Sequence, residues 1–318
     1  MSEKQMAEVS DAGPGSLNDM IGQTSVMAQV AVALSAASAD ATKFPHAILC
    51  GPPGVGKSQT AAIIARAMNT KLHEILGQTI KSAAELNCLL LEVEEDRTIV
   101  HIDEAHEIDR VYQTALLYAL DQRRVFLQGS KAGAQSIPIS DFTLLLSSTD
   151  EHRLVQPLRD RMKLVLRFEF YSTEELTAIL SQRSRALDWT VDERVLPFIA
   201  ERSRGTPRLA LRLLQACRRV CRAERATEIT LDHMRRAFLM EEIDHLGLGR
   251  LEQQYLDFLV TGGSALWAIA STLGLPPRTV SLVVEPFLMR QGLVVKDERN
   301  RRQLTKKGRE HLSRKANS

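Results

Sequence analysis

A loop with the pattern of a phosphate-binding site lies near the start of the chain. It reads GPPGVGKS, from Gly51 to Ser58, and it lies between the apolar segment AILC and a segment of helical character. Its glycines let backbone N–H groups turn towards phosphates, Lys57 reaches the β- and γ-phosphates, and the Ser58 hydroxyl binds Mg²⁺. The loop therefore predicts a site for ATP and Mg²⁺, with contacts from Gly51, Pro52, Pro53, Gly54, Val55, Gly56, Lys57, Ser58 and Gln59.

Two adjacent carboxylates follow the apolar segment in TIVHIDEAH. The strand-like residues carry Asp103 to the carboxyl edge of the predicted sheet, where open α/β sheets bind ligands and where Asp103 can hold Mg²⁺. Glu104 can polarise the attacking water as a general base. The pair predicts hydrolysis of ATP and not binding alone. We interpret His101, within the strand, as a buried core residue.

A third strand-like segment, DFTLLLSST, ends in Ser147, Ser148 and Thr149, whose hydroxyls can lie near the γ-phosphate or the attacking water. The segment PLRDRM follows it and places Arg159 and Arg161 around an aspartate. An arginine aimed at the transferred phosphoryl group can accelerate hydrolysis by about 10³- to 10⁵-fold. From spacing alone, two interpretations remain open: a contact with the nucleotide of a neighbouring subunit in a ring, or an ion cluster at the surface.

Strand-like and helical segments alternate through the first half of the chain, which predicts an α/β domain with a parallel sheet. A capping box of Ser172 and Glu175 then opens a region with helical periods only. After DHLGLG, a helix at 250–262, a helix-turn-helix and the hairpin LVVKDERNRRQLT predict a winged-helix arrangement. The predicted parts are a disordered tail (1–16), an ATPase domain (17–170), a helical lid (171–242) and a winged-helix domain (243–318).

Composition limits the class of protein. Of the 318 residues, 44% are hydrophobic and 25% are charged, as in soluble globular proteins. No apolar run approaches the roughly 20 residues of a membrane helix, and the first sixteen residues do not resemble a signal peptide, so we expect a cytoplasmic protein without membrane contact. The four cysteines form no CxxC pair, which favours neither a zinc site nor disulfides; Cys217 and Cys221 fit small packing residues one helical turn apart.

Positive charge gathers at the end of the chain. From Lys296 onwards there are nine basic residues and three acidic ones. This segment fits either a surface that contacts nucleic-acid phosphates or a solvated terminus, and charge alone leaves both interpretations open.

Taken in order, these motifs resemble the AAA+ ATPases of the RuvB family, the bacterial motors of Holliday-junction branch migration. The resemblance covers nearly the whole chain and rests on IGQ, GPPGVGK, IDEAH, PLRDR, LRFEFYSTEEL, RGTPRLALRLL and VVEPFLMRQGLV. It implies an AAA+ P-loop domain with a helical lid and a C-terminal winged helix. The family usually has an aromatic residue at the position of Met20 and an arginine at that of Gly13, so the adenine pocket differs here.

The resemblance also implies roles for single residues. Arg161 is the arginine finger that acts on the ATP of the next subunit, Thr149 is the sensor-1 residue, and Arg208 is the sensor-2 arginine. Ile21, in IGQ, joins the nucleotide contacts. The DNA backbone contacts implied for the wing are Arg299, Arg301 and Arg302.

The partners implied are duplex or four-way-junction DNA, a homo-oligomeric ring that is a hexamer, and a RuvA-type protein that docks on the hairpin in RRVFLQGSKAGAQSIPIS. The expected function is an ATP-dependent DNA motor, or helicase, in recombination and repair. Two alternatives remain: an ATP-switched DNA-binding regulator, and a clamp-loader-like or protein-remodelling ATPase. The basic wing favours phosphate contacts, and the winged helix argues against a remodelling ATPase.

Overall fold

A computed structural model describes residues 13–93, 98–127 and 135–316 of the chain. By internal contacts the chain divides into two units, one of Met1–Asp188 with Gly205–Leu209 and one of Trp189–Arg204 with Ala210–Ser318. Each unit has a hydrophobic core of its own. Within the described ranges, no helix combines the length and apolar character needed to cross a membrane.

The first unit is built on a five-stranded sheet with the order β2-β3-β6-β1-β7, in which every neighbouring pair is parallel. The strands are β1 (Ala47–Cys50), β2 (Leu72–Leu76), β3 (Thr98–Asp103), β6 (Phe142–Ser148) and β7 (Leu164–Arg167). The three central strands β3, β6 and β1 are buried along almost their whole length, because a parallel sheet is covered on both faces. The prediction of a parallel α/β sheet is confirmed.

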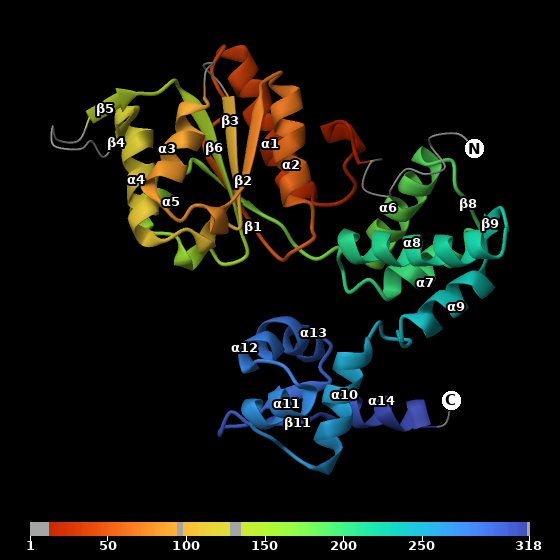
Figure 1. The fold of residues 1–318 in the computed structure, drawn as a ribbon. Helices are drawn as coiled ribbons and strands as arrows, with labels where there is room; N and C mark the ends of the chain where they lie inside the picture. The colour runs from red at the N-terminus through yellow and green to blue at the C-terminus, as the bar shows by residue number, and fades with distance from the viewer. Residues whose placement is uncertain (1–12, 94–97, 128–134, 317–318) are drawn as a thin grey trace. The chain divides into compact units, whose positions relative to one another are not determined.

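Helices cover both faces of this sheet. Figure 1 shows α1 and α2 on one side of it and α3 and α4 on the other. The helices of the unit are α1 (Thr24–Ala39), α2 (Lys57–Ala67), α3 (Ala83–Leu91), α4 (Arg110–Gln122), α5 (Gln156–Arg159) and α6 (Thr173–Ala186). Short 3-10 turns are η2 (Leu17–Asp19), η3 (Gly77–Thr79), η4 (Ala105–Glu107) and η5 (Glu151–Arg153). The predicted capping box opens α6: the Ser172 hydroxyl accepts from the Glu175 N–H, and the Glu175 carboxylate accepts from the Ser172 N–H.

Two sequence predictions fall partly on residues outside the described ranges. The hairpin expected to dock a partner is present as the antiparallel pair β4 (Arg124–Leu127) and β5 (Gln135–Pro138), and its tip, 128–134, lies outside the described residues. Most of the predicted disordered tail, 1–12, lies outside them as well. Its last part, 13–16, contacts α2, because the Pro14 carbonyl accepts a hydrogen bond from Gln59 Nε2 at 3.0 Å.

The second unit begins with the lid helices α7 (Val195–Glu201) and α9 (Leu231–Met240) and most of α8 (Pro207–Ala223). Two short parallel strands, β8 (Thr190–Val191) and β9 (Glu228–Ile229), lie among them. Cys217 and Cys221 are fully buried in α8 as free thiols, which confirms their interpretation as packing residues.

The winged helix occupies the rest of the second unit, as predicted. Its elements are α10 (Arg250–Phe258), η6 (Leu259–Thr261), α11 (Leu266–Leu273), α12 (Pro277–Thr279), η7 (Val280–Val284), α13 (Glu285–Arg290), β10 (Val294–Lys296), β11 (Arg302–Leu304) and α14 (Lys306–Ala316). The segment η7 is a π-helix directly before Pro286, whose missing N–H and bulky ring disturb the α-helical ladder. Strands β10 and β11 form the antiparallel wing.

One predicted DNA contact is wrong: Arg302 lies in the core of the winged helix and not on its surface. Its side chain is 4% exposed, and its guanidinium forms an ion pair with the buried Glu285 at 2.6 Å. The hydroxyl of Tyr255 donates a second hydrogen bond to the same carboxylate at 2.8 Å. The neighbouring Arg301, directly before β11, is exposed, as is Gln303, since side chains alternate between the two faces of an extended chain.

Arg204 joins the lid helices to the winged helix within the second unit. Its guanidinium donates to the Gly247 carbonyl at 2.9 Å, pairs with Glu252 at 2.7 Å and lies 4.7 Å from the ring centroid of Phe287. The Arg204 carbonyl in turn accepts from Arg290 Nη2 at 2.5 Å. Arg204 therefore holds the segment before α8 to the helices α10 and α13 and to the segment that precedes α10.

We expect Arg302→Ala to destabilise the winged helix by about 3–5 kcal/mol, because it leaves the buried Glu285 carboxylate without its cation. Hydrogen exchange of peptides from 280–304, followed by mass spectrometry, measures this as a lower free energy of opening. Arg301→Ala is the matched control and should change the opening free energy by less than about 0.5 kcal/mol. Equal effects of the two substitutions would contradict the buried pair.

Candidate active site

The phosphate loop connects the end of the buried strand β1 to the first turn of α2. At Gly51 (φ +151°) an added Cβ would lie 2.5 Å from the Phe168 carbonyl oxygen, and at Gly54 (φ +77°) it would lie 2.8 Å from Cβ of Arg208. These close approaches and the positive φ angles require glycine at both positions. These two glycines therefore let the loop close against Phe168, directly after β7, and against the start of α8.

Lys57 is the first residue of α2, and its side chain reaches back into the phosphate loop that precedes the helix. Its Nζ donates hydrogen bonds to the carbonyls of Gly51 at 2.9 Å and Pro52 at 2.8 Å, and its side chain is buried. Burial lowers the pKa of this ammonium, and the nearby carboxylates of Glu104 and Asp103 oppose that shift. A buried cation is therefore held where a triphosphate would meet the N-terminus of α2.

Ser58, in the first turn of α2, and Asp103, the last residue of β3, come together at the end of the sheet. The Ser58 hydroxyl donates to Asp103 Oδ2 at 3.1 Å, although the two residues are 45 positions apart. The other carboxylate oxygen of Asp103 accepts from the Glu104 N–H at 2.9 Å. A hydroxyl and a carboxylate oxygen are hard ligands of the kind that Mg²⁺ prefers, so the pair fits the predicted ion.

Glu104 is held in an unusual backbone conformation, with φ of +49° at a residue that is not glycine. Strained backbone conformations of this kind are common at functional sites, where the surrounding structure holds a side chain in position. The carboxylate of Glu104 lies 3.5 Å from Thr149 Oγ1 and 3.4 Å from Nδ1 of His106. The structure therefore places the predicted general base beside the predicted sensor residue.

His106, absent from the predicted site, supports this pair. Its ring lies 3.5 Å from Thr149 Oγ1 and 3.2 Å from Ser148 Oγ, and the ring is almost fully buried. Its position in the motif IDEAH, three residues after Asp103, is the signal that could have identified it. His101 is a core residue as predicted: its ring nitrogens meet Glu74 at 3.1 Å and Ser147 at 2.8 Å.

Tyr171 is a second residue that the sequence interpretation missed. Its hydroxyl donates to the Val55 carbonyl in the phosphate loop at 3.2 Å, and burial raises the pKa of the phenol to about 12. It precedes the Ser172 cap of α6, a position where hydrophobic residues are directed onto the helix. Gly22, of the IGQ motif, approaches the same ring: an added Cβ would lie 2.8 Å from Tyr171 Cε1 and 2.8 Å from Glu175 Oε1.

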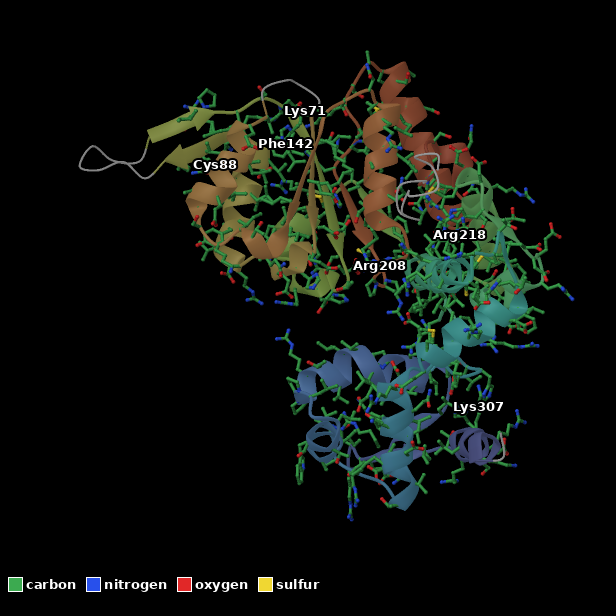
Figure 2. All side chains as sticks on the ribbon, turned by 45° about the vertical axis from the view of Figure 1, so that its right-hand side comes forward. Lys71, Cys88, Phe142, Arg208, Arg218 and Lys307 are labelled. Atoms are coloured by element: carbon green, nitrogen blue, oxygen red, sulfur yellow. The ribbon has the colours of Figure 1, made fainter. Side chains whose placement is uncertain are left out.

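Arg208, labelled in Figure 2, lies at the phosphate loop as expected for a residue that contacts nucleotide. Its backbone N–H donates to the Gly54 carbonyl at 3.3 Å, and its side chain is exposed at the edge of the loop. The predicted residues Lys57, Ser58, Asp103, Glu104, Thr149 and Arg208 therefore surround one edge of the sheet.

Arg161 is engaged elsewhere. Its guanidinium makes a two-pronged ion pair with Asp121 of α4, at 2.7 and 2.9 Å, and remains exposed. This hydrogen bonding raises the pKa of Arg161 and lowers that of the Asp121 carboxyl. The structure thus fixes Arg161 against α4, and among the described residues its guanidinium pairs with Asp121 and not with the phosphate loop of its own chain.

The wing presents the other two predicted DNA contacts to solvent. The side chains of Arg299 and Arg301 are exposed, and the Asp297 carboxylate accepts from both of their backbone N–H groups, at 2.9 and 2.8 Å. The Arg301 guanidinium also donates to the Gly263 carbonyl. Asp297 therefore shapes the turn of the wing that carries both arginines.

Comparison with known families matches the whole of this arrangement. Residues 13–168 match the Holliday junction DNA helicase RuvB P-loop domain, residues 171–244 the RuvB AAA lid domain, and residues 245–313 the RuvB C-terminal winged helix domain. The chain belongs to the RuvB family. The similarity thus includes the nucleotide edge of the sheet, the lid and the wing.

Among RuvB relatives, the Holliday junction branch migration complex subunit RuvB of Corynebacterium glutamicum (strain R) is 35% identical over 295 residues, which cover 91% of this chain and 81% of that protein. The RuvB of Kosmotoga olearia is 32% identical over 306 residues, covering 94% and 89%. The solved structure of the Thermotoga maritima RuvB Holliday junction branch migration motor is similar with a TM-score of 0.83 and 30% identity, over 95% of this chain and 98% of that chain.

We expect Gly22→Ala to weaken ATP binding by about tenfold. The new Cβ would overlap the Tyr171 ring, and this overpacking would push the ring away from the phosphate loop. Fluorescence titration with a labelled ATP analogue measures the Kd. Gly15→Ala is the control, since its Cβ would meet only Asp19 Oδ2, at 3.6 Å. An unchanged Kd for Gly22→Ala would show that Tyr171 does not shape the site.

We expect Glu104→Gln to slow hydrolysis by about 10²- to 10⁴-fold while ATP binding is retained, because the general base is lost and Lys57 remains. Single-turnover hydrolysis and the Kd for ATP separate the two effects. The control is Glu107→Gln, which alters a nearby carboxylate that pairs with Arg153 at 2.6 Å. Comparable losses in both variants would contradict the role of Glu104.

Proposed function

We propose that this chain is an ATP-driven motor that translocates duplex DNA and drives branch migration of Holliday junctions in recombination and repair. The observation that carries this proposal is the convergence of Ser58, Asp103 and Glu104 at one edge of the sheet, in a chain that also carries a winged helix. The names of its relatives, Holliday junction branch migration complex subunits, support the same activity. We propose that the protein acts in the cytoplasm, where it would meet this DNA.

In the proposed reaction, Lys57 and the loop N–H groups bind the phosphates of ATP, and Ser58 and Asp103 hold Mg²⁺, which supplies charge neutralisation for the leaving phosphates. Glu104 orients the attacking water and accepts its proton. Thr149, 3.5 Å from the Glu104 carboxylate, detects the γ-phosphate side of the site. From the lid, Arg208 reads whether nucleotide is bound. Ile21, beside Gly22, belongs to the adenine side of the pocket.

A ring is proposed because Arg161 is exposed and oriented by Asp121 at the surface of its own subunit. In a head-to-tail ring, which we propose to be a hexamer, this guanidinium would reach the γ-phosphate bound by the next subunit. Asp121 holds the fork geometry that suits phosphate oxygens. The side chain of Arg161 therefore loses its conformational entropy within its own subunit, before the subunits assemble.

The proposed DNA surface is the wing, where Arg299 and Arg301 would contact phosphates and give weak sequence preference. The proposed junction-binding partner, a RuvA-type protein, would dock on the β4–β5 hairpin. The proposed functional parts are the tail (1–16), ATPase domain (17–170), lid (171–242) and winged helix (243–318). The three family matches, at 13–168, 171–244 and 245–313, support three successive parts with boundaries within a few residues of these.

The ring proposal is tested by mixing subunits. We expect Arg161→Ala and Lys57→Ala each to lower steady-state ATP hydrolysis by about 10³-fold or more. An equimolar mixture should recover part of the activity, because an intact loop then faces an intact arginine across a subunit boundary. Mixing Arg161→Ala with the double variant Lys57→Ala/Arg161→Ala is the control and should recover none. Equal activity in the two mixtures would overturn action in trans.

The motor proposal is tested by adding DNA. Hydrolysis is measured without DNA, with linear duplex and with a synthetic four-way junction, and strand exchange of the junction is followed on gels. Stimulation by DNA together with ATP-dependent junction movement supports a motor. Nucleotide binding with turnover indifferent to DNA would instead favour a regulator or a remodelling ATPase.

A further inference from the structure

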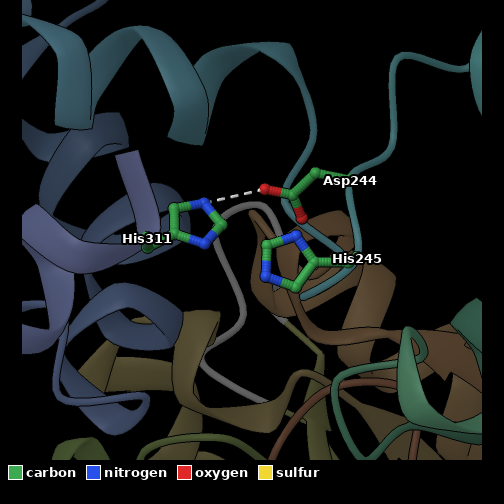
Figure 3. A group of neighbouring side chains, drawn as sticks. All are labelled: Asp244, His245 and His311. Carbon is green, nitrogen blue, oxygen red and sulfur yellow. Dashed lines mark ion pairs between the residues drawn. The ribbon is translucent and has the colours of Figure 1, made fainter. Parts of the chain in front are cut away.

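Three possible metal ligands meet at the point where the lid joins the winged helix in the second unit. Asp244 and His245 lie in the segment after α9, and His311 lies on α14, 66 positions after His245 in the chain. One ligand atom from each of the three lies within 4.8 Å of the others. Figure 3 shows the three side chains turned towards one another, with the ion pair between Asp244 and His311 drawn as a dashed line.

The local structure orients the carboxylate in this cluster. Asp244 Oδ1 accepts from the backbone N–H groups of Leu246 at 2.9 Å and Leu248 at 2.8 Å, which fixes the turn of the DHLGL segment. This leaves Oδ2 directed at His311, whose Nε2 lies 2.9 Å away. A carboxylate held by two N–H groups is pre-oriented for whatever binds its other oxygen.

The two histidines differ in exposure. The side chain of His311 is 3% exposed, whereas His245 is exposed at the surface. Their rings are 4.8 Å apart between centroids and inclined by 35°, so both imidazoles reach the same small volume. Asp244 and His245 also line a cavity of about 410 Å³ between α7 and α9, although the Oδ2 atom of Asp244 is itself buried.

We propose that Asp244, His245 and His311 form a site for a divalent transition-metal ion of the Zn²⁺ type. Zinc takes imidazole nitrogens and carboxylate oxygens at about 2.0–2.2 Å, which puts neighbouring ligand atoms of a tetrahedral site about 3.3 Å apart. Asp244 Oδ2 and His311 Nε2 are 2.9 Å apart, which is already close to this separation between ligand atoms. Rotation of the exposed His245 ring brings the third ligand into place, and a water from the cavity supplies the fourth.

The identity of the donors selects the class of ion. Two imidazoles and one carboxylate suit Zn²⁺, Co²⁺ or Ni²⁺, whereas Mg²⁺ and Ca²⁺ prefer oxygen ligands. The site shares no residue with the proposed nucleotide site, since all three ligands belong to the second unit and Ser58 and Asp103 belong to the first. Bound metal would cross-link the segment entering the winged helix to the last helix of that domain.

The test uses the full-length chain, freed of metal and nucleotide, titrated with Co²⁺ and then with Zn²⁺. A four-coordinate nitrogen-containing site gives intense visible Co²⁺ absorption, which oxygen-rich sites such as Ser58 with Asp103 do not give. We expect about one equivalent of Co²⁺ to produce this band and Zn²⁺ to abolish it. Equilibrium dialysis then measures the Zn²⁺ affinity of each variant.

We expect His245→Asn and His311→Asn each to lower the affinity for Zn²⁺ by about 100-fold. His245 is exposed, so its substitution should leave the fold intact, which circular dichroism checks. His152→Asn, at another exposed histidine, is the control and should keep the band and the affinity. Absence of the visible band in the unmodified chain, or the same affinity in His245→Asn and His152→Asn, would overturn the site and leave Asp244 and His311 as a simple ion pair.

Discussion

The parallel pairing of β6 between β1 and β3 is the constraint on which the nucleotide site depends. Leu146 of β6 lies opposite Ile48 of β1 on one side and Ile102 of β3 on the other, and all three side chains are buried. Because the strands run in the same direction in this register, the segments that follow them emerge at one edge of the sheet. A slip of one residue would turn the side chains to opposite faces and separate Asp103 from Ser58.

That edge concentrates features that would destabilise a protein elsewhere. A lysine is buried, a glutamate is held at positive φ, and a glycine-rich loop lies against the backbone of Phe168, directly after β7. Each is compensated locally: carbonyl oxygens and two carboxylates surround Lys57, and His106 and Thr149 lie beside Glu104. The apolar core beneath holds these groups in place, so the site is built before ligand arrives.

Three charge pairs lie in the interior of the second unit. Arg302 is buried with Glu285, Arg204 pairs with Glu252 where lid and winged helix meet, and His311 meets Asp244. Unpaired burial would cost several kcal/mol for each ion, so these pairs fix which elements can lie together. Arg299 and Arg301 of the wing remain exposed to solvent. The same residue type is thus buried and paired at one position and exposed at the next.

The sequence by itself determined what depends on neighbouring residues: the phosphate loop, the acidic pair after β3, the capping box of α6 and the order of strands and helices. These follow from local geometry and apolar periodicity, which a single segment contains. Only the tertiary structure decided that Arg302 is buried while Arg301 is exposed, and that Arg161 pairs with Asp121, 40 positions away. Such contacts join segments distant in the chain, and packing selects among the partners that composition permits.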